Sequence, residues 1–95
     1  MKPVGVGVIG CGNISAAYLT AAKKFPMLDI VAVSDLNPAA AEARAAEFGL
    51  TARSIDEVLA DPAVEIVLNL TVPKAHVEVG LQAIAAGIPC YNLPP

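Results

Sequence analysis

The sequence has little of what marks several large classes of protein, and these absences narrow its function. It has no tryptophan, and its six lysine and arginine residues are outnumbered by nine aspartates and glutamates. With a net charge of −3, it has no basic stripe of the kind that nucleic-acid-binding proteins present to phosphates, so nucleic acid is not an expected partner. No apolar stretch reaches the roughly 18 uninterrupted residues of a membrane span, so no membrane partner is expected either.

Cysteine is also scarce. Cys11 and Cys90 have no metal-ligand spacing, so no metal site is predicted, and they could form one disulfide at most. Cys11 follows the first predicted strand and Cys90 lies near the start of the last, which are opposite ends of a parallel sheet. Free thiols are therefore expected. The opening residues show no cleavable signal pattern, which favours the cytoplasm.

Apolar residues, by contrast, are abundant. Of the 95 residues, 56% are hydrophobic and 16% are charged, which predicts one small globular domain over residues 1–95. Nearly continuous apolar runs at 4–9, 29–34 and 65–70 predict strands that are covered on both faces. Weaker runs at 51–53 and 89–92 predict two further strands.

Helical segments lie between these runs. Residues 13–25 carry an apolar stripe at helical spacing, with Lys23 and Lys24 expected in the last turn and Pro26 preventing continuation. Residues 73–86 predict another helix, which ends at Gly87. The stripe of the first helix consists of Ile14, Tyr18, Ala21 and Phe25, and that of the last helix consists of Val77, Leu81 and Ile84.

Capping residues mark two more helices. Asn37 is the predicted N-cap of a helix that has Pro38 at its first position and stops at Gly49. Ser54 and Glu57 form a capping-box pattern. Strands and helices thus alternate, which predicts an α/β fold: a doubly wound parallel sheet, Rossmann-like, with about five strands in the order 3-2-1-4-5.

The stretch "GCGNIS" lies between the first strand and its helix. Gly10 permits a sharp turn, and Gly12 lets the backbone approach a pyrophosphate at the mouth of the helix. Ser15 occupies the third position of this glycine pattern, and its hydroxyl is expected to face the phosphate. The alternative is a tight turn that binds no ligand.

An acidic residue is expected about 20 residues after such a turn, at the end of the second strand, where it holds the adenosine ribose. Asp35 occupies that place. Its alternative role is to cap the next helix. No arginine or lysine stands beside it in "SDLNP", so NAD is favoured over NADP as the cofactor.

The block "NLTVPKAH" follows the fourth predicted strand, where the strand order reverses and ligands bind. Asn69, Thr71 and His76 are its polar groups, and Pro73 stiffens the turn. Proximity to the nicotinamide half of the cofactor is one interpretation. The other gives Thr71 a capping role and His76 a structural hydrogen bond, and no catalytic residue is assigned.

Together these blocks resemble the amino-terminal NAD(P)-binding domain of the Gfo/Idh/MocA oxidoreductases, the glucose–fructose oxidoreductase and inositol dehydrogenase group. The resemblance implies NAD(P)-dependent chemistry on sugars, polyols or related small molecules. It also implies a set of cofactor-binding residues along the pyrophosphate, the adenosine and the nicotinamide. These are Gly10, Gly12, Asn13, Ile14, Ser15, Asp35, Leu36, Leu70, Thr71, Pro73 and His76.

The sequence departs from that family at its end. Tyr91 matches the family tyrosine, but Leu93 and Pro94 stand where the family has glutamate and lysine, before Pro95. The family's second, substrate-closing domain does not follow, so a catalytically incomplete cofactor-binding domain is expected. One alternative is a folded fragment without ligand function that self-associates through its exposed sheet edge and apolar surface. A less favoured one is a methyltransferase that binds S-adenosylmethionine.

Overall fold

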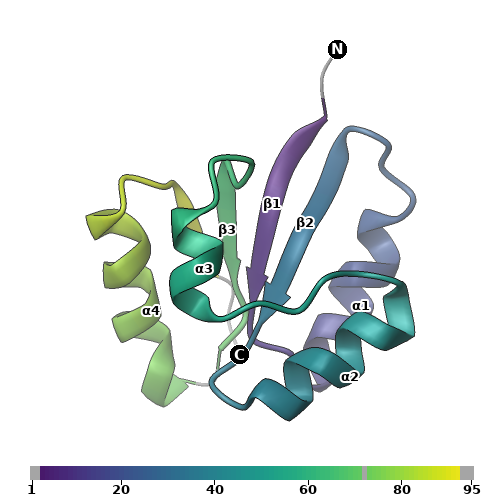
Figure 1. Ribbon diagram of the computed structural model, residues 1–95, viewed down its shortest axis with the longest axis horizontal. Helices are drawn as coiled ribbons and strands as arrows, with labels where there is room; N and C mark the ends of the chain where they lie inside the picture. The colour runs from purple at the N-terminus through teal and green to yellow at the C-terminus, as the bar shows by residue number, and fades with distance from the viewer. Residues whose placement is uncertain (1–2, 72, 93–95) are drawn as a thin grey trace.

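A parallel sheet forms the centre of the fold (Figure 1), and the described residues contribute four strands to it. The computed structural model describes residues 3–71 and 73–92, so the predictions made for Leu93, Pro94 and Pro95 lie outside the described residues. The strands run in the order β2-β1-β3-β4. They are β1 (Val4–Ile9), β2 (Leu28–Ser34), β3 (Ile66–Asn69) and β4 (Cys90–Asn92).

The strand predicted at 51–53 is reduced to a single bridge beside β2. Ala52 pairs in parallel with Val33, whose amide donates to the Thr51 carbonyl at 2.9 Å, while the Arg53 amide donates to the Val33 carbonyl at 3.0 Å. With this bridge the predicted order 3-2-1-4-5 is confirmed. Few residues lie between the end of the preceding helix and the cap of the following one, so no longer strand forms there. The prediction of a fifth strand is therefore confirmed only in part.

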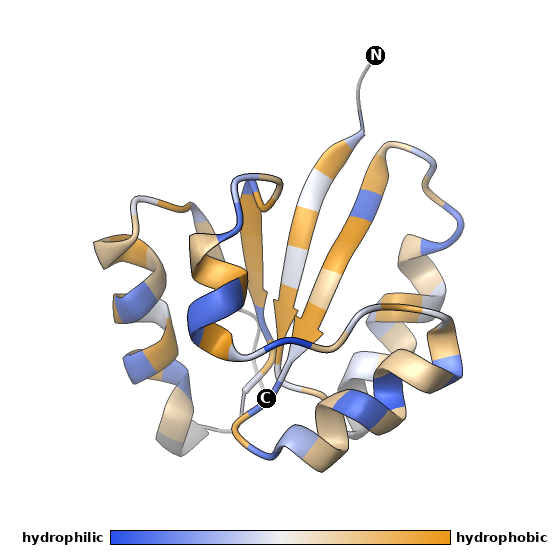
Figure 2. Ribbon diagram, viewed as in Figure 1, coloured by the Kyte–Doolittle hydropathy of each residue, from blue (hydrophilic) through white to orange (hydrophobic). Residues whose placement is uncertain are grey.

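Helices cover both faces of the sheet (Figure 1). Residues of α1 and α2 share one apolar cluster with β1 and β2, and residues of α3 and α4 share a second cluster on the opposite face. Figure 2 shows largely hydrophobic strands between helices of mixed character, as a doubly wound sheet requires. The helices are α1 (Asn13–Ala22), α2 (Pro38–Phe48), α3 (Ile55–Ala60) and α4 (Pro73–Ala85).

The predicted caps of α2 and α3 are confirmed. Asn37 accepts a hydrogen bond from the Ala39 amide at 3.1 Å, and Gly49 ends α2 in the left-handed conformation with φ +67°. Ser54 and Glu57 accept from each other's backbone amides at 3.1 and 3.0 Å. These hydrogen bonds lower the pKa of the Glu57 carboxyl below its usual value.

The prediction for the end of α1 was wrong. The helix stops at Ala22, so Lys23 is its C-cap and Lys24 and Phe25 lie beyond it. The amides of Lys24 and Phe25 donate three residues back instead of four, at 3.0 and 3.1 Å, and this tighter winding leads into Pro26.

The predicted stripe of α4 does not mark its buried face, and in the stripe predicted at 13–25 only Tyr18 among the described side chains packs against the core. Phe25 is 54% exposed, and in α1 it is Ser15 and Leu19 that are buried. In α4 the stripe of Val77, Leu81 and Ile84 faces outward, each residue being at least 60% exposed. The inner positions of α4 are taken by Ala75, Val79 and Ala83, whose smaller side chains let the helix lie close to the sheet.

The sequence predicted no disulfide, no membrane span and no metal site, and the described part of the chain can be compared with each prediction. Among the described residues, Cys11 and Cys90 do not form a disulfide, in agreement with the prediction. Within residues 3–71 and 73–92, no helix combines the length and the hydropathy needed to cross a membrane. In the same ranges, histidine, cysteine and acidic residues do not gather into a group that could hold a metal ion.

The turn after β1 imposes a strict steric requirement. Gly10 has φ +110°, and a Cβ there would lie 2.6 Å from the Leu70 carbonyl carbon and 2.7 Å from the Thr71 nitrogen. The end of β1 therefore lies in direct backbone contact with the end of β3. Gly12 is different, because its φ is −76° and a Cβ would meet no atom within 4 Å.

We expect Gly10→Ala to destabilise the fold by about 2–4 kcal/mol, because the substitution combines a strained φ with a backbone clash. Gly12→Ala is the matched control, and its free energy of unfolding should stay within about 0.5 kcal/mol of the parent. Urea denaturation of the three proteins measures both values. Equal losses for the two variants would contradict this account of the turn.

Candidate functional site at the carboxyl edge of the sheet

The carboxyl ends of β1, β2 and β3 lie side by side. Ile9 is in register with Ser34 on one side and with Asn69 on the other. Two backbone bonds continue this alignment past the strands: the Gly10 amide donates to the Ser34 carbonyl at 2.7 Å, and the Leu70 amide donates to the Ile9 carbonyl at 2.8 Å. The three segments predicted to form one site are therefore adjacent.

Gly12 leaves open space at the mouth of α1. It is exposed, its backbone is extended, and no side chain of the described residues caps the helix. Neither its φ nor its packing requires glycine, since a Cβ would project into open space. The first-turn amides of α1 are therefore positioned to receive an acceptor from outside the chain. The backbones of Asn13 and Ile14 begin this helix, but their side chains are not described.

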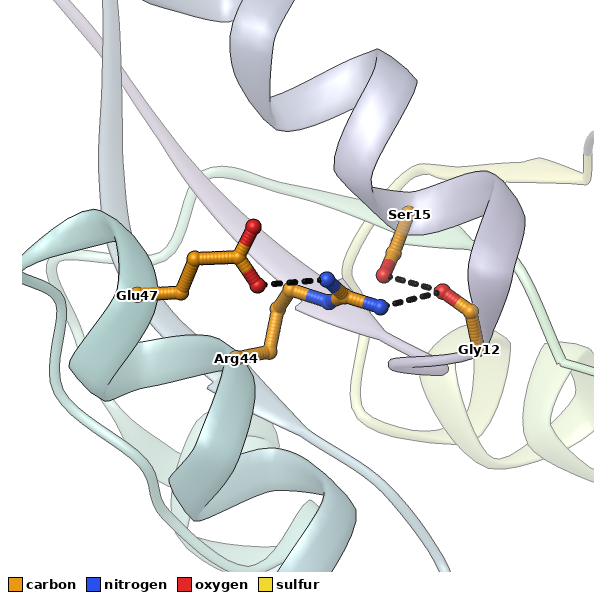
Figure 3. A network of polar contacts seen from close by, with 4 residues as sticks. All are labelled: Gly12, Ser15, Arg44 and Glu47. Carbon is orange, nitrogen blue, oxygen red and sulfur yellow. Dashed lines mark hydrogen bonds and ion pairs between the residues drawn. The ribbon is translucent and has the colours of Figure 1, made fainter.

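The Gly12 carbonyl is held on the other side of the turn (Figure 3). It accepts hydrogen bonds from the Ser15 hydroxyl at 2.6 Å, the Ser15 amide at 3.1 Å and Nη2 of Arg44 at 3.1 Å. Ser15 is fully buried. The structure thus differs from the prediction that its hydroxyl faces a phosphate, because the hydroxyl proton is used within the turn.

The Asp35 carboxylate joins the turn to the start of α2. One oxygen accepts from the Cys11 amide at 2.6 Å and the other accepts from the Asn37 amide at 2.8 Å. Asp35 is half-buried and lies against the glycine turn. The helix-capping interpretation and the interpretation as part of the site are thus compatible, because each oxygen serves one backbone donor and keeps further acceptor capacity.

Cys11 is a structural residue of this turn. Its side chain is buried, and its thiol donates to the Ser34 carbonyl with an Sγ to oxygen distance of 3.3 Å. Burial raises the pKa of the Cys11 thiol to about 11, with a further contribution from the Asp35 charge and a smaller, opposing one from Arg44. The thiol is therefore protonated near neutral pH and weakly nucleophilic.

A hollow of about 500 Å³ lies beside Asp35, between the starts of α2 and α3. Leu36, 66% exposed, gives it an apolar wall. The charged side chains among its described lining residues are four carboxylates and one guanidinium, so the hollow carries net negative charge. They are Asp35, Glu42, Asp56 and Glu57, with Arg53.

The polar residues after β3 bond to one another. Thr71 donates from its hydroxyl to Asn69 Oδ1 at 2.6 Å, and Asn69 Nδ2 donates to the His76 carbonyl at 2.8 Å. His76 Nδ1 lies 3.2 Å from the Thr71 carbonyl oxygen, which can only accept, so Nδ1 carries the proton. This network closes the turn into α4. It agrees with the structural interpretation of His76 and leaves Nε2 as an acceptor.

Leu70 and Pro73 are the remaining predicted residues of this segment. Leu70 is buried, and its backbone lies against Gly10. Pro73 begins α4, and its side chain is not described. Leu70 therefore packs at the carboxyl edge of the sheet. That Leu70 and Pro73 bind a ligand stays a prediction.

Arg44 was missed in the sequence analysis. It comes from the middle of α2 and reaches the turn after β1, 32 residues earlier in the chain. The sequence held no local signal for it, because the contact joins α2 to a distant turn of the chain.

Comparisons with known proteins agree with this geometry. The profile of the Gfo/Idh/MocA family, described as an oxidoreductase family with an NAD-binding Rossmann fold, matches residues 4–91. The inositol 2-dehydrogenase of Agrobacterium fabrum is 37% identical over 92 residues, which cover 93% of this chain and 27% of that protein. The acetaldehyde dehydrogenase of Geobacillus genomosp. 3 is 32% identical over 98 residues, covering 99% of this chain and 32% of that protein.

A solved structure has a similar fold. The myo-inositol dehydrogenase of Lactobacillus casei, in complex with NAD(H) and myo-inositol, superposes with a TM-score of 0.83 at 29% identity, covering 94% of this chain and 27% of that one. The chain thus spans about a quarter to a third of the length of these relatives. From the family profile and the fold, the chain belongs to the Gfo/Idh/MocA oxidoreductase family and forms its NAD-binding Rossmann domain.

Proposed function

We propose that residues 1–95 are the dinucleotide-binding domain of an oxidoreductase. In this proposal the pyrophosphate of NAD lies at the mouth of α1, over Gly12 and the amides of Asn13 and Ile14. The observation that carries the proposal is the 2.6 Å hydrogen bond from the Cys11 amide to Asp35, because it joins the glycine turn to the carboxylate that would hold the ribose. The open space at Gly12 supports it.

The ribose site follows from the acceptor capacity of Asp35. An ionised carboxylate has about four lone-pair sites, and the Cys11 and Asn37 amides take one on each oxygen. The remaining sites can accept from the two ribose hydroxyls of the adenosine. Leu36 offers apolar surface for the adenine at the same place. The carboxylate is already held by the backbone, so binding the ribose requires little rearrangement.

The nicotinamide end would lie over the segment after β3. Leu70, Thr71, Pro73 and His76 border it in this proposal, with Thr71 and His76 fixed by the Asn69 network. NAD, when bound, supplies the hydride acceptor or donor. The part of this chain is to hold and orient it, since the sequence has a single histidine and its Nδ1 proton is directed to a backbone carbonyl.

The substrate is selected elsewhere in this proposal. The relatives include proteins named for inositol and for acetaldehyde, and this chain covers 27% of the first and 32% of the second. A sugar, polyol or related small molecule is the substrate class that the family and the inositol dehydrogenases favour. We also propose a cytoplasmic location for the protein.

A second candidate function rests on exposed apolar surface. Val77, Leu81 and Ile84 form a stripe along the outside of α4. Apolar stripes of this kind favour association between protein surfaces. In this second candidate the domain self-associates through α4.

We expect Asp35→Ala to weaken NAD binding by at least about tenfold, because it removes charge-assisted acceptors of the ribose hydroxyls. Isothermal titration calorimetry measures the change. Asp56→Ala is the matched control. Asp56 lines the same hollow, but its carboxylate has no described hydrogen bond to the turn. A similar loss in both variants, or no saturable NAD binding by the parent, would contradict the proposed function.

We also expect a preference for NAD over NADP of about tenfold or more at low salt, because a 2′-phosphate brings roughly two negative charges into an acidic hollow. The preference should narrow as the ionic strength rises and screens these charges. Competition titrations of both dinucleotides at two salt concentrations test this. Equal affinities at low salt would show that Arg53 offsets the surrounding carboxylates.

The second candidate predicts a dimer in size-exclusion chromatography that Leu81→Glu converts to a monomer, because a charge in the apolar stripe is costly to bury. Glu78→Gln changes an exposed residue of the same helix outside the stripe and should leave the dimer intact. A parent protein that elutes as a monomer with or without NAD rules out self-association through α4.

A further inference from the structure

The guanidinium of Arg44 occupies a position between α2 and the glycine turn that stability alone does not explain (Figure 3). Its Nη1 donates to Glu47 at 2.7 Å and its Nη2 donates to the Gly12 carbonyl at 3.1 Å. Its Nε is buried and has no hydrogen-bond partner among the described residues. Glu47 is 54% exposed, and such an ion pair contributes little, whereas a buried donor without an acceptor is costly.

The contact with Gly12 has a consequence for the neighbouring amide. The Gly12 carbonyl and the Asn13 N–H belong to one planar trans peptide, so they point in opposite directions. Arg44 and Ser15 hold the oxygen from one side. The Asn13 N–H is thereby directed away from α2, toward the mouth of the helix. Only Arg44 among these donors carries a charge and comes from another helix.

We propose that Arg44 is a positioning residue for the dinucleotide: it fixes the Gly12–Asn13 peptide so that its amide faces the pyrophosphate, and it adds a positive charge behind that peptide. This inference rests on the proposed function, since it concerns the same ligand. The charge of Arg44 already acts within the turn, because it lowers the pKa of the Cys11 thiol against the larger effects of burial and Asp35. The arginine therefore links α2 to the phosphate-binding end of α1.

The test is Arg44→Met, which keeps an unbranched stem and removes every donor and the charge. We expect NAD to bind about tenfold more weakly, while the thermal midpoint of the ligand-free protein stays level or rises. Glu47→Ala is the matched control, because it breaks the ion pair and leaves the Gly12 contact. Its NAD affinity should stay within about twofold of the parent. Arg44→Lys, which keeps the charge and one donor, should recover part of the affinity.

A second measurement separates positioning from general stability. In the ligand-free Arg44→Met protein, the ¹H–¹⁵N amide resonances of Gly12 and Asn13 should move more than those of Ala52, which lies outside the turn at the far edge of the sheet. The inference is overturned if Arg44→Met binds NAD as the parent does, or if its affinity and thermal midpoint fall together with no local change at Asn13. A parent protein that does not bind NAD would instead remove the proposed function, and this inference with it.

Discussion

The hydrogen bond from the Cys11 amide to the Asp35 carboxylate is the constraint on which the site depends. It joins the turn after β1 to the end of β2 at 2.6 Å, while the same carboxylate holds the Asn37 amide at the start of α2. A charged acceptor between two backbone donors is stronger than a neutral one and fixes direction as well as distance. The steric contact of Gly10 with the end of β3 completes the arrangement, because it fixes the turn from the other side.

The parts of the fold that local chemistry decides could be predicted from the sequence. Strand alternation, the Asn37 cap, the Gly49 stop and the Ser54–Glu57 box depend on residues close together in the chain, and each is present. The order of the strands follows from general rules on parallel crossovers and is also present. Of the site, the sequence predicted which segments meet at the carboxyl edge and the acidic residue that lies there.

What the sequence could not supply depends on distances between elements. The inner face of α4 is formed by residues such as Ala75 and Ala83, whose small side chains let the helix lie close to the sheet, and Ser15 is buried beside Leu19 in α1. A search for large apolar stripes therefore selects the wrong face of α4. The Arg44 contact with Gly12 spans two helices, and no local pattern encodes it. In both cases tertiary packing outweighs the periodicity of the sequence.

Gly10 and Gly12 look equivalent in the sequence, but the structure gives a different reason for glycine at each position. Gly10 is required by the chain itself, since its φ is positive and its α-carbon lies against backbone. Gly12 satisfies neither condition, and other residues could adopt its conformation in the ligand-free protein. Folding does not require glycine here, at the uncapped mouth of α1, and the Gly12 carbonyl is held from behind by Arg44. The proposed function accounts for this glycine, because a pyrophosphate at the helix mouth would occupy the space that a Cβ would fill. In the proposed function Asp35 and Arg44 have complementary tasks: Asp35 would accept from a ribose in front of the turn, and Arg44 would orient the turn from the far side.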